Sequence, residues 1–419
     1  MLKIGVIADD FTGATDIASF LVKNGLSTIQ LTAVDETLKA PENVEAIVIS
    51  GKTRSCEVNL AIEESLRALR WLQSQGCERF YFKYCSTFDS TAKGNIGPIT
   101  DALMQELGVD FTILSPALPV NGRTVYKGYL FVNDGLLSES GMRHHPITPM
   151  TDSNLTRLMQ MQSQGKCAVI DVNVLKRSPE DILAYAAKLK AQGFSYAAVD
   201  AIDEDDLIKQ GQAFCNYKLV TGGSGLAIGL AQALRDNQDN LAMEAGRPQG
   251  KYAVALSGSC SVMTNKQVAT YKAKASALEA DVSGILEGRA DESIKKAVDF
   301  VLAHKDEPLA PLIYATADPD KLHDIQKRFG VAKSSHAVEQ FFAKVAIALK
   351  QAGFERFIVA GGETSGIVTK SLEVKGFYIG PSVAPGVPWV RAINTPISLV
   401  LKSGNFGNED FFAVAQKEY

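Results

Sequence analysis

The chain has 419 residues, of which 46% are apolar and 21% charged, a composition typical of a globular protein with a sizeable core. This composition excludes a disordered chain, a collagen-like repeat and a coiled coil. The 43 Lys and Arg residues nearly balance the 47 Asp and Glu residues, and the net charge of −4 argues against nucleic-acid or anionic-lipid partners. No apolar run approaches the roughly 20 residues that a membrane-spanning helix needs.

The N-terminal segment is predicted to be a strand rather than a secretion signal, because Asp9 and Asp10 interrupt its apolar run. Six cysteines are too few for a disulfide scaffold, and none forms a C-x-x-C pair. Both features favour a cytoplasmic protein with free thiols.

Short apolar runs alternate with helix-period stretches through the first half of the chain. The first strand is predicted at 3–8, and apolar residues from Ala14 to Val22 then follow at helical spacing. Further strands are predicted at 46–50, 79–84, 111–115, 168–172, 196–200 and 218–221, with helices at 60–75 and 178–192. Near-continuous apolar strands between helices indicate a mostly parallel sheet covered on both faces.

A polar stretch with two glycines and one proline, 236–250, interrupts this alternation and is predicted to be a linker. A second α/β unit follows it, with strands predicted at 252–256, 312–315, 357–360 and 398–402 and helices at 264–274, 292–304 and 336–351. The sequence therefore predicts two α/β domains, residues 1–235 and 251–419.

Two adjacent carboxylates, Asp9 and Asp10, lie at the carboxyl end of the first predicted strand. Ligands bind outside this edge of open α/β sheets. An N-cap on the following helix would explain one of the two aspartates. A second carboxylate in the same place favours a functional site.

The segment 83–95 continues another strand into a loop dense in hydroxyl, carboxylate and ammonium groups. Such a loop can hydrogen-bond a polyhydroxylated acid, and Lys83 can pair with its carboxylate. A solvated turn is the alternative. The candidate substrate-binding residues in this loop are Lys83, Ser86, Thr87, Asp89 and Ser90.

Two further segments of the first domain carry candidate substrate contacts. Arg123 offers a planar fork suited to a carboxylate, and Lys127 follows it, although a hairpin with an exposed arginine is almost as good an interpretation. Gly222 and Gly223 would let the backbone approach a ligand. The alternative for these glycines is a tight turn that needs positive φ.

The second domain has three glycine- and serine-rich loops, each directly after a predicted strand, at 257–261, 361–366 and 402–407. Small residues and backbone amides that converge on one sheet edge fit a nucleotide and its phosphates. Glu363 could hold Mg²⁺ or a ribose hydroxyl. Neither G-x-x-x-x-G-K-[ST] nor G-x-G-x-x-G occurs, which disfavours a P-loop kinase and a standard dinucleotide enzyme.

Together these features predict an acid-binding domain and a nucleotide-binding domain, with the active site in the cleft between them. Phosphoryl transfer fits this combination, because it needs alignment, charge neutralisation and a carboxylate near the accepting hydroxyl.

The sequence resembles the four-carbon acid sugar kinase family, and most closely its 3-oxo-tetronate kinases. Motifs over nearly the whole chain carry the resemblance: ADDFTGATD at 8–16, KYCSTFDST-x-x-GNIGP at 83–98, PALPVNGRTVYKGYLFV at 116–132, SESGMRHHPITPM at 138–150, VTGGSG at 220–225, LSGSCSVMTNKQ at 256–267, AGGETSG at 360–366, APGVPW at 384–389 and LKSGNFG at 401–407.

The resemblance implies ATP-dependent phosphorylation of the terminal hydroxyl of 3-oxo-tetronate to the 4-phosphate, with Mg²⁺ entering as MgATP. Threonate and erythronate are alternative substrates within the same family. The positions that fall on the family's nucleotide-binding residues are Ser259, Gly361, Gly362, Glu363, Thr364 and Gly404.

We assign roles as hypotheses. Asp10 is the base at the accepting hydroxyl, and Asp9 positions it or contacts Mg²⁺. Lys83 and Arg123 bind the substrate carboxylate. A non-catalytic sugar-acid sensor and a hydroxy-acid oxidoreductase are the rivals from other classes. The metal ligands, the stereochemistry of the acid and the oligomeric state, a homo-oligomer included, are left open.

Overall fold

The computed structural model describes residues 1–145, 148–236, 242–317 and 319–417. It divides into two compact units, Met1–Ala242 and Met243–Tyr419. Of the predicted linker 236–250, residues 237–241 lie outside the described residues. Within the rest of it, the 3-10 turn Glu244–Gly246 packs against a strand of the second unit.

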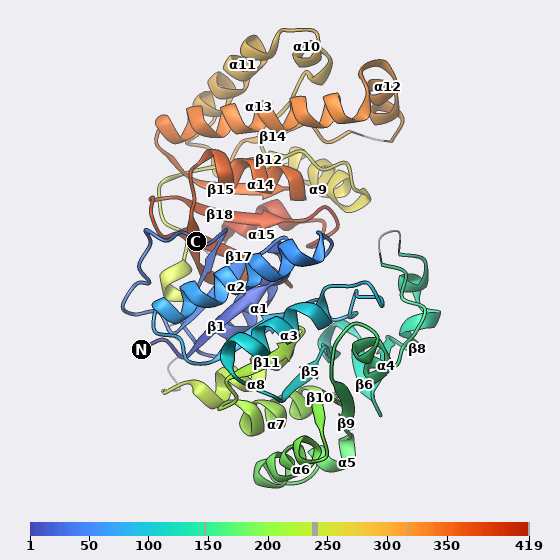
Figure 1. The fold of residues 1–419 in the computed structure, drawn as a ribbon. Helices are drawn as coiled ribbons and strands as arrows, with labels where there is room; N and C mark the ends of the chain where they lie inside the picture. The colour runs from blue at the N-terminus through green and yellow to red at the C-terminus, as the bar shows by residue number, and fades with distance from the viewer. Residues whose placement is uncertain (146–147, 237–241, 318, 418–419) are drawn as a thin grey trace. The chain divides into compact units, whose positions relative to one another are not determined.

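The first unit is built on one parallel sheet, coloured blue to yellow-green in Figure 1. The order of its strands is β2 (Thr28–Leu31), β3 (Ala46–Ser50), β1 (Ile4–Ala8), β4 (Phe80–Lys83), β11 (Leu219–Gly222), β5 (Thr112–Ser115), β10 (Phe194–Val199) and β9 (Lys166–Ile170). Every pairing among them is parallel. All residues of the central strands β1, β4 and β11 are buried, so the near-continuous apolar runs correctly predicted a sheet covered on both faces.

Strand β2 was not predicted, because its sequence alternates polar and apolar residues. The fold buries its polar side chains with partners. Thr28 donates to the carbonyl of Leu26 at 2.8 Å, and the Gln30 amide donates to Oγ of Ser50 at 2.8 Å. A buried polar side chain that is hydrogen-bonded is tolerated in a core strand.

Helices connect the strands of the first unit (Figure 1). They are α1 (Phe11–Lys23), α2 (Val58–Ser74), α3 (Ile96–Leu107), α4 (Leu155–Gln160), α5 (Val172–Leu175), α6 (Pro179–Ala191), α7 (Glu204–Phe214) and α8 (Leu226–Leu234). Helices α1, α2 and α6 confirm the predicted helical stretches. Helix α1 buries the apolar stripe that contains Ala14, Ile17 and Leu21, as its 3.6-residue spacing predicts.

A small antiparallel sheet follows β5 and stands apart from the parallel one. It consists of β6 (Arg123–Tyr126), β7 (Tyr129–Val132) and β8 (Gly135–Leu136), and 3-10 turns flank it at Pro119–Asn121, Leu137–Glu139 and Gly141–His144. The Arg123 segment therefore forms a hairpin, but Arg123 itself is half-buried and is not the exposed arginine of that interpretation. Lys127 and Gly128 make the turn with φ of 51° and 74°, a conformation common in tight hairpins.

The second unit contains a mixed sheet. Its strand order is β13 (Ala277–Glu279), β14 (Leu312–Tyr314), β12 (Tyr252–Ser257), β15 (Phe354–Ala360), β18 (Ser398–Lys402), β17 (Val387–Ala392) and β16 (Gly376–Ala384). The strands from β13 to β18 pair in parallel, and β16 and β17 add an antiparallel hairpin. Trp389 of this hairpin is 1% exposed and packs in the core.

The helices of the second unit are α9 (Val262–Lys272), α10 (Val282–Leu286), α11 (Ala290–Ala303), α12 (Pro319–Phe329), α13 (Val331–Gln351), α14 (Gly362–Ser371) and α15 (Phe411–Lys417). Helices α9, α11 and α13 confirm the three helices that the sequence predicted here. Among the described residues, no helix combines the length and apolarity needed to cross a membrane.

Candidate active site

Three neighbouring strands bring the acidic and basic candidates to one edge of the first sheet. Ala8 of β1 pairs with Lys83 of β4, and Lys83 pairs with Gly222 of β11. Asp9 and Asp10 follow Ala8 directly, so they leave the sheet beside Lys83. The register thus confirms that these residues share the carboxyl edge of the sheet, where α/β proteins bind ligands.

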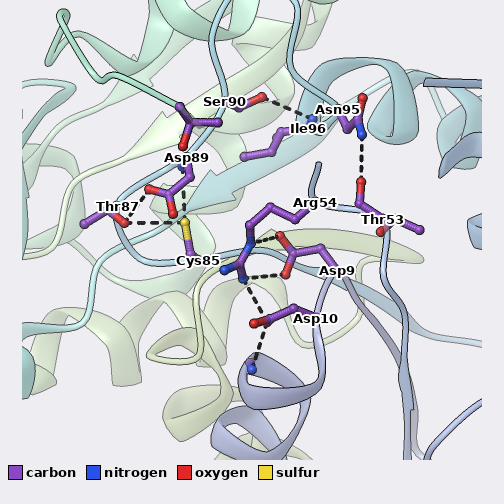
Figure 2. Close-up of polar contacts among 12 residues, drawn as sticks. Asp9, Asp10, Thr53, Arg54, Cys85, Thr87, Asp89, Ser90, Asn95 and Ile96 are labelled. Atoms are coloured by element: carbon purple, nitrogen blue, oxygen red, sulfur yellow. Dashed lines mark hydrogen bonds and ion pairs between the residues drawn. The ribbon is translucent and has the colours of Figure 1, made fainter. Parts of the chain in front are cut away.

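An arginine that the sequence reasoning did not single out joins the two aspartates (Figure 2). Arg54 lies in the loop after β3. Its Nε donates to Oδ2 of Asp9 at 2.8 Å, and its Nη2 donates to Oδ1 of Asp9 at 2.9 Å and to Oδ1 of Asp10 at 2.8 Å. This bidentate pair fixes the plane of the Asp9 carboxylate. No described acceptor is bonded to Nη1, which Figure 2 shows turned toward Cys85.

The two aspartates have different surroundings. Asp9 is 4% exposed, and this burial raises the pKa of its carboxyl, while the hydrogen bonds and charge of Arg54 and the charge of Lys83 act in the opposite direction. Asp10 is the N-cap of α1, and its Oδ1 accepts from the amide of Gly13 at 2.9 Å. Its Oδ2 takes part in no hydrogen bond within the described part of the chain.

Lys83 is the second cation of the site and is 2% exposed. Its ammonium donates no hydrogen bond and makes no ion pair among the described residues. A Cβ at Gly13 would lie 2.8 Å from Nζ of Lys83 and would also collide with the Asp10 carboxylate, so a larger residue here would displace one of these side chains. The ammonium therefore lies beside the first turn of α1, close to the aspartates.

A third carboxylate, Asp16, lies on α1 three residues after Gly13 and thus on the same helix face. Ser224 donates a hydrogen bond to its Oδ2. Burial raises the pKa of Asp16, with the positive charge of Lys83 and the bond from Ser224 opposing that shift and the charge of Asp10 adding to it. The positive charge of Lys83 thus acts on the carboxylates of both Asp9 and Asp16.

The loop after β4 folds onto itself. Thr87 donates to the carboxylate of Asp89 at 2.6 Å, and the Asp89 amide donates to the sulfur of Cys85 at 3.1 Å. Phe88 between them has φ of 50°, a strained value for an aromatic residue. Ser86 has no side-chain hydrogen bond among the described contacts. Figure 2 shows Thr87, Asp89 and Cys85 on one side of Arg54.

Two side chains of this loop have structural partners. The Ser90 hydroxyl is fully buried and donates to Oε1 of Gln162 at 2.6 Å. The Asn95 amide donates to the carbonyls of Thr53 and Cys56 at 2.7 and 3.0 Å, and so ties this loop to the one that carries Arg54. A contact from Ser90 to a substrate would have to replace its bond to Gln162.

Arg123 and Lys127 lie on the β6–β7 hairpin, and no described contact links them to Asp9, Asp10 or Lys83. Arg123 donates from Nη1 to the carbonyl of Asn121, while its buried Nε has no hydrogen-bond partner among the described residues. The Lys127 side chain is exposed, and its amide donates to the buried carboxylate of Asp200 at 2.7 Å. Asp200 therefore anchors the hairpin turn to the end of β10.

Gly222 and Gly223 are glycines for a steric reason. Their φ angles are not positive, so the alternative of a positive-φ turn is wrong. A Cβ at Gly222 would collide with the carbonyl of Ser115, and one at Gly223 would lie 2.5 Å from the carbonyl of Pro116. The close approach of β5 and β11 thus requires both glycines, whatever ligand they contact.

In the second unit, the three predicted loops meet at the carboxyl ends of β12, β15 and β18, which are neighbours in the sheet. A Cβ at Gly404 would lie 2.8 Å from Oγ of Ser259, and one at Gly361 would lie 3.1 Å from the amide of Ser259 and from the Thr364 hydroxyl. Gly361 has φ of 120°, which requires glycine. These residues are therefore packed against one another.

Helix α14 begins at Gly362 within this group, with Gly361 as its N-cap. The first turn of a helix has free amide groups that favour an anion. Gly362 has open space around its Cα, and Glu363 is exposed, while the buried Ser365 hydroxyl has no hydrogen-bond partner in the described part of the chain. The arrangement is suited to a phosphate-bearing ligand.

Arg54 and Asp16 are the charged residues that sequence reasoning missed in the candidate substrate site, at the carboxyl edge of the first sheet. Asp16 could have been found from its spacing to Gly13 on one helix face. Arg54 follows the predicted strand 46–50, but its importance depends on β3 being the neighbour of β1, which the sequence does not state.

This architecture is that of an α/β protein of two units, with a candidate substrate site in the first and a candidate phosphate site in the second. Residues 4–230 match a family model described as a sugar-binding N-terminal domain, and residues 254–412 match one described as a nucleotide-binding C-terminal domain. The chain belongs to the four-carbon acid sugar kinase family.

Two named relatives and one solved structure are similar to the chain over its full length. A 3-oxo-tetronate kinase of Pectobacterium atrosepticum is 58% identical, and one of Salmonella typhimurium is 55% identical, each over 100% of both chains. The crystal structure of a Haemophilus influenzae protein is 53% identical over 99% of both chains, with a TM-score of 0.92. The family and the fold that the sequence predicted are thereby confirmed.

Proposed function

We propose that this protein is an ATP-dependent kinase that phosphorylates the 4-hydroxyl of 3-oxo-tetronate, giving the 4-phosphate and ADP. The observation that carries the proposal is its identity of 58% and 55% to two proteins named 3-oxo-tetronate kinase, over their whole length. The candidate substrate site supports it, because the buried ammonium of Lys83, which has no partner among the described residues, suits a small carboxylate.

In this proposal, residues 1–235 bind the acid and residues 251–419 bind ATP. Lys83 pairs with the substrate carboxylate, and Arg123 assists through its unpaired Nε. Thr87, Asp89 and Ser86 bind hydroxyl groups. The lack of described contacts between the hairpin and the aspartates makes Arg123 the less direct of the two cations.

Asp10 is the base of the proposed reaction. Its Oδ2 is free to accept the proton of the 4-hydroxyl as that oxygen attacks the γ-phosphorus of ATP. Its Oδ1 is held by Arg54 and Gly13, which fixes the direction of the carboxylate. Both carboxylate oxygens of Asp9 accept hydrogen bonds from Arg54, so Asp9 serves to position the guanidinium and, through it, Asp10.

Mg²⁺ is expected to enter with ATP. Mg²⁺ that accompanies a nucleotide is usually bound by phosphates and water with one or two carboxylates. The exposed carboxylate of Glu363, at the first turn of α14, is the residue that would hold it. When bound, Mg²⁺ neutralises phosphate charge.

A coupled ADP-release assay with MgATP and a panel of 3-oxo-tetronates, threonates and erythronates of both hands tests the function. Turnover confined to a 3-oxo acid is the expected result. Turnover with threonate or erythronate alone would keep the kinase and change its substrate. Tight ATP binding without turnover on any acid would contradict the kinase and favour a sensor.

Arg123→Ala is expected to raise the KM for the acid roughly tenfold, because a charge-assisted hydrogen bond contributes about 1.5–3 kcal/mol. Steady-state kinetics at saturating ATP measure the effect. Arg157→Ala is the control, since Arg157 is an exposed arginine of the same unit in a surface ion pair with Asp152. An unchanged KM would remove Arg123 from the substrate site.

Ser259→Trp is expected to abolish ATP binding while acid binding persists, because a bulky ring at Ser259 would occupy the space between Gly361 and Gly404. Calorimetry with each ligand separately measures both affinities. Ser259→Ala, which adds no volume, should keep ATP binding. Loss of both ligands in Ser259→Trp would indicate misfolding and no specific effect on the nucleotide.

A further inference from the structure

Lys402, the last residue of β18, is a buried lysine that no step of the proposed reaction uses. It is 1% exposed. Its Nζ donates to Oγ1 of Thr264 at 2.9 Å, to the carbonyl of Gly404 at 3.0 Å and to the carbonyl of Ser403 at 3.3 Å. All three acceptors are uncharged, which is unusual because a buried ammonium is stable only with strong compensation.

The groups packed around this ammonium do not supply a counter-charge. Helix α9 contributes Thr264, and α15 contributes the ring of Phe411, whose centroid is 5.7 Å from Nζ. The ionisable residues on or next to the surrounding elements form no ion pair with Lys402 in the described part of the chain; they are Lys266, Tyr271, Lys272, Glu355, Arg356, Glu363, Lys370, Arg391, Glu409, Asp410 and Lys417. The positive charge is therefore unbalanced within the second unit.

Lys402 also joins the three loops of the candidate nucleotide site. Its carbonyl accepts from the amide of Gly361 at 2.9 Å, next to the first turn of α14. Its ammonium holds the carbonyl of Gly404, which also accepts from Ser261 at 2.6 Å and from Thr264 at 2.7 Å. Loss of the ammonium would leave the Gly404 carbonyl held by two hydroxyl groups alone, while Gln267 would still hold the carbonyls of Phe406 and Gly407 further along the loop.

We propose that Lys402 is a positioning residue for the nucleotide: its protonated ammonium holds the Gly404 loop in place, and the phosphates of the bound nucleotide supply the missing counter-charge. Binding of the nucleotide is therefore coupled to uptake of a proton by Lys402. This inference rests on the proposed function of the second unit.

The direction of the coupling follows from the burial of Lys402, which lowers the pKa of its ammonium to about 8. Below that pH the ammonium is charged with or without ligand, and no proton is taken up. Near that pH part of the free protein carries a neutral Lys402, and an incoming polyanion favours the charged form. Nucleotide affinity should therefore fall as the pH rises through about 8.

Calorimetric titration with MgADP in two buffers of different ionisation enthalpy measures the proton uptake directly. At about pH 8 the two apparent binding enthalpies should differ, and that difference divided by the difference in buffer ionisation enthalpy should give uptake of a fraction of a proton per nucleotide bound. At about pH 6.5 the two enthalpies should agree. MgADP is the probe because it binds without turnover. Thermal unfolding of each variant is followed in parallel.

Three variants test the residue. Lys402→Arg keeps a charge that does not titrate, so it should bind MgADP with proton uptake abolished. Lys402→Met should weaken MgADP binding by about tenfold or more. Lys266→Met is the matched control, because Lys266 is an exposed lysine of α9 whose ammonium pairs with Glu409 at the surface, and it should behave as the unchanged protein.

Undiminished proton uptake in Lys402→Arg would overturn the inference even if Lys402→Met fails to fold. Full MgADP affinity in a folded Lys402→Met would do the same. In both cases MgADP binding by the unchanged protein would leave the proposed function standing. Absence of any MgADP binding to the unchanged protein would instead overturn the proposed function, and this inference with it.

Discussion

Asp10→Asn is expected to lower kcat by about 10²- to 10⁴-fold, the usual contribution of a general base. The variant tests the base alone, because the asparagine oxygen can still accept from the amide of Gly13 and asparagine caps a helix as well as aspartate does. The fold of α1 should therefore persist. The coupled ADP-release assay gives kcat and KM, and thermal unfolding reports the fold.

Asp203→Asn is the matched control for this experiment. Asp203 is also an N-cap aspartate of the first unit, and its carboxylate accepts from the amide of Asp206 at 2.9 Å. The substitution should change neither kcat nor KM. Near-normal turnover of Asp10→Asn with an unchanged KM would show that Asp10 is not the base, and Asp16, the other carboxylate beside Lys83, would be the next residue to test.

The strands that position the site could be predicted because each is a short apolar run that ends in a polar residue. Asp9 and Lys83 were found in this way, since both follow or end a buried strand. Their proximity also followed from a general property of parallel sheets, whose carboxyl ends lie at one edge.

Contacts that depend on the order of the strands could not be predicted. Arg54 reaches Asp9 only because β3 is the neighbour of β1, and Ser224 reaches Asp16 across 208 residues of sequence. A single sequence contains no signal for such pairings. Composition and spacing therefore identified the residue types of the site but not the partners that hold them.

Local sequence was misleading in the hairpin of the second unit. Pro381 and Pro388 argue against strands, because proline lacks the amide that a strand needs. The structure accommodates them through shifts in register between β16 and β17 around Ser382. A β-bulge absorbs a residue that cannot join the ladder, and this solution is visible only in three dimensions.

Lys83→Met is expected to raise the KM for the acid by about 10- to 100-fold, the effect of losing one charge-assisted hydrogen bond. Methionine fills nearly the same volume without the charge, so the packing between β1 and β11 should survive. The KM for ATP should stay unchanged, because the nucleotide site lies in other residues. Steady-state kinetics with each substrate varied in turn separate the two effects.

Lys218→Met provides the comparison, because Lys218 precedes β11 at the opposite, amino edge of the same sheet and donates to the carbonyl of Leu107 at 2.8 Å. It should leave both KM values unchanged. An equal rise in KM for Lys218→Met would show that the loss of any lysine perturbs the sheet. An unchanged KM in Lys83→Met would leave its buried ammonium without a substrate partner and would make Arg54, through its free Nη1, the better candidate for the carboxylate.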